Sequence, residues 1–225
     1  MNITLNTLQQ EAIYNIKKLI IDGHLKLGAR VNEVEVANLL NVSRGPIRES
    51  LRILSREGLV TYIPRRGMFV TPLEEKDIQE IYDIRFYLEK NAVELGFHKI
   101  TPKIMEQLEG IIRKMETASK ENRRDQLVDL DHEFHEQIIS LPGYKRLKDS
   151  WDAYTSLIEL IFAEVFRLGS EKVEDIPHTH RLLTEALKTG DREHFIAELN
   201  THYSMGKESL LALWGQRKSD YINKK

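Results

Sequence analysis

The chain has 225 residues, 41% hydrophobic and 30% charged, so it can bury a substantial core and belongs to the globular class. Its net charge of −2 excludes a protein that coats nucleic acid through bulk charge, and the lack of cysteine excludes disulfides and thiolate metal sites. Charge is nevertheless segregated, because residues 1–72 carry ten Lys and Arg against six Asp and Glu, while the remainder carries 23 against 29. The surplus of basic residues therefore lies at the N-terminal end.

Three helices are predicted in the N-terminal part. Apolar residues at helical spacing over 8–20 indicate an amphipathic helix that stops near Gly23. A short second helix is expected over about residues 33–40. A third helix lies between Ser43, which is placed to cap it, and Gly58, which is suited to end it in the left-handed conformation.

The third helix carries basic and apolar side chains on separate faces. Arg44, Arg48 and Arg52 recur at every fourth position and share one face, because an α-helix turns about 100° per residue. A second face is apolar and consists of Ile47, Leu51 and Leu54. The apolar face is expected to dock on the protein. The basic face could be a solvated surface with salt bridges, or it could bind a partner.

Two short β-prone runs follow, at 59–63 and 68–70, around a turn with the sequence PRRG. Helix, short helix, turn, basic helix and a hairpin with a basic tip form the layout of a winged helix-turn-helix. In that layout the third helix lies in the major groove of double-stranded DNA, and the wing touches the neighbouring backbone or minor groove. Arg44 and Arg48 are then placed for guanine edges, while Arg52 reaches a phosphate at most. The expected DNA-binding residues are Ser43, Arg44, Arg48, Arg52, Arg65, Arg66 and Gly67.

This region resembles the N-terminal domain of GntR-family bacterial transcription regulators. The resemblance rests on GARVNEVEVANLLNVSRGPIRESLRILSREGLV followed by PRRGMFV, and it covers about residues 8–72. Gly45 departs from the family pattern, because a threonine usually stands there. The hydroxyl contact to phosphate is then absent, which changes the expected operator sequence but not the expectation of DNA binding.

The rest of the chain is predicted to be helical, which makes the fold class mostly α. An all-α antiparallel bundle is expected from helices at about 76–99, 102–121, 124–140, 144–168, 177–189 and 191–214. The predicted organisation is a DNA-binding domain at 1–72, a linker at 73–76, an effector-binding and dimerisation domain at 77–215 and a fraying tail at 216–225.

Asp131 and His135 lie four residues apart on one helical face, where a carboxylate and an imidazole can hold one cation. A surface Asp–His pair would have the same spacing. His180 and His202, on the last two predicted helices, can complete a set of four ligands. Single histidines on helices are also common as core or surface residues, so the spacing alone leaves both interpretations open.

The bundle resembles the effector-binding FCD-type domain of the FadR subfamily of GntR regulators, over about residues 76–215. The resemblance rests on IYDIRFYLEKNAVELG, DHEFH and HRLLTEALKTGD, followed by His202. In many members an Asp, a His four residues later and one His on each of two later helices bind a divalent metal, which often meets a small carboxylate ligand. The resemblance implies such a site at Asp131, His135, His180 and His202. The nitrogen-rich donors favour zinc or nickel and are compatible with iron or manganese.

Arg85 can pair with Glu89 four residues later, or it can clamp an effector carboxylate beside the metal, which the resemblance favours. The sequence thus predicts a cytoplasmic, ligand-responsive regulator that binds a pseudo-palindromic operator as a homodimer and is not an enzyme. No membrane span or signal peptide is expected. Two alternatives stay open: a metal-dependent hydrolase or isomerase, for which no general base is evident, and a regulator that senses the metal itself.

Overall fold

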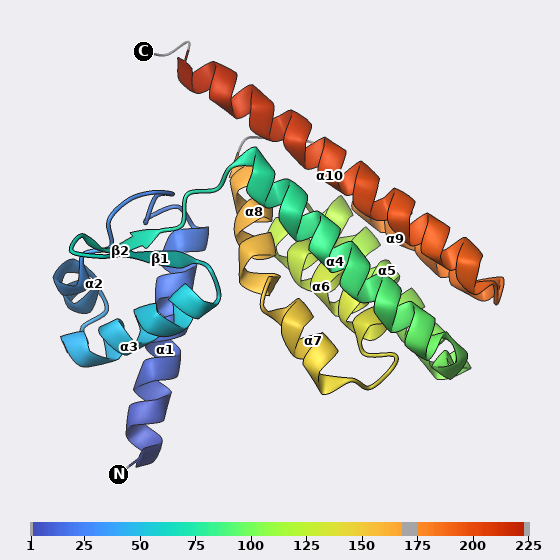
Figure 1. Ribbon diagram of the computed structural model, residues 1–225, viewed down its shortest axis with the longest axis horizontal. Coiled ribbons are helices and arrows are strands. Elements are labelled where there is room, and N and C mark those ends of the chain that lie inside the picture. The colour runs from blue at the N-terminus through green and yellow to red at the C-terminus, as the bar shows by residue number, and fades with distance from the viewer. Residues whose placement is uncertain (1, 168–174, 223–225) are drawn as a thin grey trace. The chain divides into compact units, whose positions relative to one another are not determined.

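The computed structural model describes residues 2–167 and 175–222, with side chains at 8–167 and 175–215 (Figure 1). The fold is mostly helical with one two-stranded sheet, which confirms the predicted fold class. The chain divides into two compact units, Met1–Glu74 with Ser156–Glu164, and Glu75–Thr155 with Val165–Lys225. The domain boundaries drawn from the sequence remain a prediction. None of the described helices combines the length and apolar character that a membrane span requires.

The first unit contains a winged helix. Its elements in chain order are α1 (Asn2–Ile21), α2 (Glu33–Leu39), α3 (Arg44–Arg56), β1 (Val60–Ile63) and β2 (Gly67–Val70). The strands pair antiparallel, with Val60 opposite Val70 and Ile63 opposite Gly67. Helices α1 and α2 and strand β1 all pack against α3, so α3 is held from several sides.

The two faces predicted for α3 are present. Ile47, Leu51 and Leu54 are each 0% exposed, and the hydroxyl of the buried Ser50 donates to the Gln9 carbonyl of α1 at 3.3 Å. These contacts fix which side of α3 remains free. The apolar face therefore docks the helix, as predicted.

The ends of α2 and α3 differ in how they are capped. Gly58 has φ +77° directly after α3, which confirms its predicted left-handed conformation. Ser43 occupies the N-cap position of α3, but its hydroxyl makes no capping hydrogen bond, contrary to expectation. Pro46, the third residue of α3, lacks one of the two N–H groups that an N-cap side chain commonly binds. Helix α2 does have a side-chain cap, at Asn32, whose Oδ1 accepts from Val34 N at 3.0 Å.

The second unit is a helical bundle. The helices after the wing are α4 (Glu75–Gly96), the 3₁₀ turn η1 (Phe97–Lys99), α5 (Pro102–Lys120), α6 (Arg124–Ile139), α7 (Lys145–Asp152), α8 (Thr155–Arg167), α9 (Asp175–Lys188) and α10 (Arg192–Ile222). All belong to this unit except α8, most of which, Ser156–Glu164, is grouped with the first unit. Helix α4 packs against α6, α7 and α10, while α5 packs against α6 and α9, and α9 against α10 (Figure 1). Helices α4, α6, α9 and α10 are therefore the walls around the bundle interior.

Two features of the bundle differ from the prediction. The single helix expected at 144–168 is two helices, because the chain turns at 153–154, where no Gly or Pro marks a break. Trp151, at the end of α7, is 1% exposed and packs with Ala92 of α4 and Ile139 of α6, so tertiary packing sets this position. The tail predicted to fray is helical as far as Ile222. Residues 168 and 223–225, which these predictions also covered, lie outside the described residues.

Candidate DNA-binding surface and metal centre

The arginines of α3 are exposed and held by weak ion pairs. Arg48 Nε and Nη2 lie 3.4 and 3.3 Å from Glu33 Oε2 on α2, and Arg44 Nη2 lies 3.7 Å from the same oxygen. Arg52 pairs with Glu49 on α3 itself, at 2.7 Å. Exposed pairs of this kind contribute only about 0.2–1 kcal/mol each, so these guanidinium groups can exchange their carboxylates for a DNA partner at little cost.

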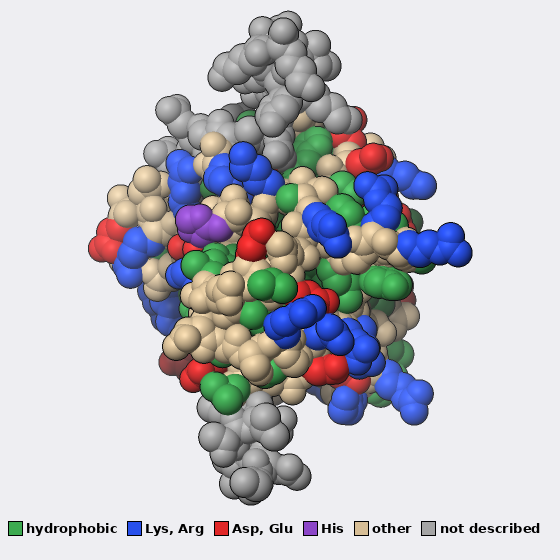
Figure 2. All heavy atoms as spheres, turned by 90° about the vertical axis from the view of Figure 1, so that its left-hand side faces the viewer, with side chains coloured by type: hydrophobic (Ala, Val, Ile, Leu, Met, Phe, Trp, Pro, Cys, Tyr) green, Lys and Arg blue, Asp and Glu red, His purple; other side chains and the backbone are tan. Residues whose placement is uncertain are grey.

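The wing presents the other basic residues. Gly67 has φ +99° at the start of β2, a conformation that suits glycine, and Arg65 is also left-handed at φ +63°. The Arg66 guanidinium lies 5.3 Å from the ring centroid of Phe69. Ser43 is exposed at the start of α3. Figure 2 turns the left-hand side of Figure 1 toward the viewer and shows Lys and Arg side chains spread over that face, with fewer carboxylates between them.

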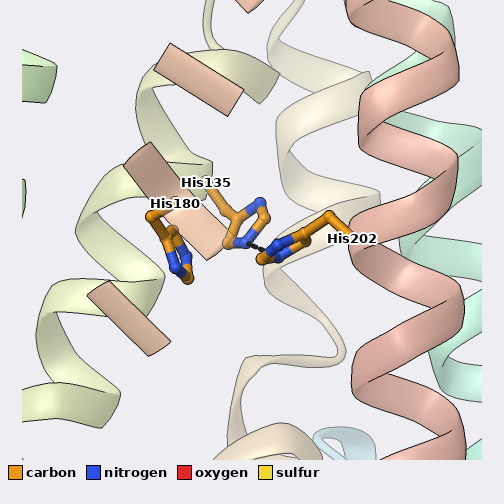
Figure 3. A group of neighbouring side chains, drawn as sticks. All are labelled: His135, His180 and His202. Carbon is orange, nitrogen blue, oxygen red and sulfur yellow. Dashed lines mark hydrogen bonds between the residues drawn. The ribbon is translucent and has the colours of Figure 1, made fainter. Parts of the chain in front are cut away.

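Three imidazoles from three helices point toward one another inside the bundle (Figure 3). His135 of α6, His180 of α9 and His202 of α10 each offer one nitrogen, and these atoms all lie within 4.8 Å of one another. His135 Nε2 and His202 Nε2 are 3.2 Å apart. Asp131, one turn before His135, adds an Oδ1 atom 3.2 Å from His180 Nε2 and 3.9 Å from His135 Nε2. The structure thus brings together all four residues that the sequence suggested as ligands.

The hydrogen bonds around this cluster leave electron pairs directed inward. His180 Nδ1 is 2.8 Å from the Ile176 carbonyl, an acceptor, so Nδ1 carries the hydrogen and Nε2 carries the lone pair. That Nε2 is buried without a hydrogen-bond partner among the described residues, although it lies 3.2 Å from the Asp131 carboxylate. His202 Nδ1 is likewise buried and unpartnered within the described part of the chain. A lone pair facing a carboxylate is repelled by it unless a cation or a proton lies between them.

The donor set fits a divalent transition-metal ion. Four ligand atoms about 2.0–2.1 Å from a tetrahedral zinc ion are about 3.3 Å from one another. The separations of 3.2 Å between His135 and His202 and between His180 and Asp131 are close to this value. Three imidazole nitrogens and one carboxylate oxygen suit zinc or nickel better than magnesium or calcium, which prefer oxygen ligands.

The ionisation of two of these residues also favours a cation. Burial by itself would raise the pKa of the Asp131 carboxyl, but the neighbouring His180, His135 and Arg85 outweigh it, so this pKa is lowered. Burial, followed by the neighbouring His180 and His135, holds the pKa of His202 well below its usual value. Near neutral pH the carboxylate is therefore ionised and the His202 imidazole is neutral, as metal ligands must be.

Arg85 of α4 is a buried cation that forms no ion pair with the described residues. Its side chain is 4% exposed, and its guanidinium lies 4.8 Å from the ring centroid of Trp151 and 6.0 Å from that of Tyr203. Among the described residues no carboxylate forms an ion pair with it within 4.0 Å, so the alternative of a pair with Glu89, whose carboxylate contacts His135, is not formed. A buried positive charge stacked on aromatic rings can accept an anionic ligand without first losing an internal partner.

Sequence reasoning missed the residues that surround His135. Glu89 was considered only as a surface partner of Arg85, and Trp151 and Tyr203 were not considered. A signal was present in α4, whose buried stripe includes the apolar Ile78 and Ala92 and yet places Arg85 and Glu89 between them at helical spacing. Two charged residues on the buried stripe of a helix indicate a polar site inside the bundle.

Comparison with known proteins places the whole chain. Residues 8–70 match the family described as bacterial regulatory proteins, gntR family, and residues 80–205 match the FCD domain. The chain belongs to the GntR family. This GntR protein is 34% identical over 194 residues to YdhC of Bacillus subtilis (strain 168), an uncharacterized HTH-type transcriptional regulator, covering 83% of this chain and 86% of YdhC. It is 30% identical over 205 residues to the gluconate operon transcriptional repressor of the same organism, covering 89% and 84%.

The fold is shared with a solved GntR-type structure. Escherichia coli McbR/YncC superposes with a TM-score of 0.77 at 22% identity, covering 92% of this chain and 98% of that one. The family match and the relatives show that the chain is a DNA-binding transcriptional regulator and not an enzyme. The hydrolase or isomerase alternative is rejected on this evidence.

Proposed function

We propose that this GntR regulator binds a pseudo-palindromic operator as a homodimer and changes its operator affinity when a small carboxylate binds beside a divalent metal in the FCD domain. The convergence of the Asp131 carboxylate with three imidazoles, of which His180 has an unpartnered buried Nε2, near the buried Arg85, carries the proposal. We assign repression, and not activation, as the direction of regulation, because the relatives include a gluconate operon repressor. The site of action is the cytoplasm, where the operator lies.

The ion would be held by Asp131, His135, His180 and His202, and it would supply positive charge and an open position for an effector oxygen. Arg85 would bind the effector carboxylate through its planar pair of N–H groups. The domain at 77–215 would therefore bind the effector, and the domain at 1–72 would bind DNA.

Arg48→Ala is expected to lower affinity for the specific operator by about 1–3 kcal/mol and affinity for random DNA much less, because a guanine contact is sequence-specific. The gain from such a contact exceeds the cost of breaking the exposed pair with Glu33. Arg52→Ala, one turn further along the same face, is the matched control and should weaken both DNAs alike. Fluorescence anisotropy with both DNAs measures this, and equal losses for Arg48→Ala on both sequences would exclude base reading.

Arg66→Ala in the wing is expected to reduce the slope of log affinity against log salt by about one, because one phosphate contact and its counterion release are lost. Lys145→Ala is the control, since this exposed lysine of α7 pairs with Asp149 and lies outside the winged helix. Operator titrations at several salt concentrations give the slope. An unchanged slope in Arg66→Ala would mean that the wing does not touch DNA.

The protein is expected to be a dimer at micromolar concentration, because one recognition helix covers only a half-site and a two-fold dimer matches a pseudo-palindrome. Sedimentation velocity of the full chain, with and without operator, measures this. A single monomeric species under both conditions would contradict the proposed mode of binding.

A further inference from the structure

Glu89 of α4 is completely buried and accepts three hydrogen bonds from three other helices. Its Oε1 lies 2.7 Å from Trp151 Nε1 of α7 and 2.5 Å from the Tyr203 hydroxyl of α10. Its Oε2 lies 2.8 Å from His135 Nδ1 of α6. The side chain is 0% exposed, so water does not compete for these bonds. Glu89 is therefore oriented by its neighbours and, in turn, orients the His135 ring.

The chemistry of the donors decides which nitrogen of His135 carries the hydrogen. The indole N–H of Trp151 can only donate, which fixes Oε1 as an acceptor. With Glu89 as a carboxylate, its other oxygen can likewise only accept, so His135 presents an N–H at Nδ1. The lone pair of His135 is then on Nε2, which is the nitrogen 3.2 Å from His202 Nε2 and 3.9 Å from Asp131 Oδ1.

We propose that Glu89 is a positioning residue that holds His135 in the tautomer whose Nε2 binds the metal, and that Trp151 fixes Glu89 in this role. The inference rests on the metal site of the proposed function. When one nitrogen of an imidazole binds a metal, a carboxylate that accepts the N–H of the other nitrogen sets the tautomer and orientation of the ring and raises the basicity of the ligand. The Ile176 carbonyl has the corresponding role for His180, because it accepts the hydrogen of Nδ1 and leaves the lone pair on Nε2.

Glu89→Gln tests this directly, because the amide has nearly the shape of the carboxylate but only one acceptor. Trp151 cannot accept a hydrogen bond, so the amide oxygen must face Trp151 and Tyr203, and the NH₂ group must face His135 Nδ1. His135 Nδ1 must then become an acceptor, which moves its hydrogen to Nε2. The expected result is a loss of zinc affinity of about 10–100-fold, measured by titration of the metal-free full chain against a chelator.

The double variant Glu89→Gln with Trp151→Phe separates the tautomer from the lost charge. Without the indole N–H the amide is free to turn, so its oxygen can accept from His135 Nδ1 while its NH₂ donates to the Tyr203 oxygen. Zinc affinity is expected to recover by about tenfold relative to Glu89→Gln, within the range that such outer partners control, although the negative charge is still absent. Trp151→Phe alone measures the effect of the smaller ring. Glu133→Gln is the charge control, because it removes a negative charge at a partly exposed position of α6 and breaks the ion pair with Lys114.

A measurement without metal distinguishes this inference from the metal site itself. Nitrogen chemical shifts of the metal-free protein report the tautomer of each histidine, and His135 should change from Nδ1–H in the wild type to Nε2–H in Glu89→Gln. A His135 tautomer that stays Nδ1–H in Glu89→Gln, or a Glu89→Gln protein that binds zinc as the wild type does, overturns the role of Glu89. A wild type that binds no zinc overturns the metal site and with it the purpose of this positioning, even where the tautomer changes as described.

Discussion

Purified His180→Ala is expected to contain no stoichiometric divalent metal and to lose its effector response, while its affinity for operator DNA without effector stays that of the wild type. The substitution removes one of the three proposed nitrogen donors, the one that lies 3.2 Å from the Asp131 carboxylate. The winged helix is built from other residues, so DNA binding does not depend on His180. Elemental analysis of the purified protein, together with operator titration, measures both results.

His178→Ala is the matched control for this experiment. It is the same substitution two residues earlier on α9, at an exposed position, whereas His180 is 1% exposed. His178→Ala should retain the metal of the wild type. Added zinc at about a hundred times its dissociation constant should also stabilise the wild type and His178→Ala by about 2.7 kcal/mol, and His180→Ala much less. Retention of stoichiometric metal by His180→Ala would remove this residue from the ligand set.

Much of this arrangement could be predicted because it depends on local periodicity. The docking face of α3 follows from apolar residues at helical spacing, and the structure buries Ile47, Leu51 and Leu54 as predicted. Asp131 and His135 share a face because they are four apart on α6. His180 and His202 were candidates on the last two predicted helices, and the resemblance to a family assigned them to the site, since no spacing within one helix brings residues of α9 and α10 toward α6.

The contacts of Glu89 could not be predicted in the same way. Its partners come from α7 and α10, and Trp151 and Tyr203 stand 62 and 114 residues further along the chain. Such a network exists only after the helices have packed, and a single sequence contains no periodicity that links them. The break between α7 and α8 was missed for a similar reason, because the packing of Trp151 and not a Gly or Pro sets the end of α7.

A small carboxylate that binds at the metal is expected to change operator affinity roughly 5–150-fold, which corresponds to a coupling free energy of about 1–3 kcal/mol. The ligand can do this only by binding two arrangements of the protein unequally. The proposed metal site would join α6 to α9 and α10, and Arg85 lies on α4, so an effector that bridges the ion and Arg85 would shift these helices together. In the proposed dimer, such a shift would re-orient the two DNA-binding domains and change the distance between them.

Arg85→Lys and Arg85→Ala test this coupling in a protein that keeps its metal. Both variants should bind zinc and operator DNA as the wild type does, because Arg85 is not among the four ligand residues. Arg85→Ala should lose the response to a panel of small carboxylates, and Arg85→Lys should lose most of it, because an ammonium group cannot form the paired contact of a guanidinium. Operator titration with zinc alone and with zinc plus each acid measures the response. A change in operator affinity with zinc alone, unaffected by any acid, would identify a regulator that senses the metal itself. A full response to an acid in both Arg85→Ala and His180→Ala would mean that the effector binds elsewhere in the protein and that the bridging mechanism is wrong.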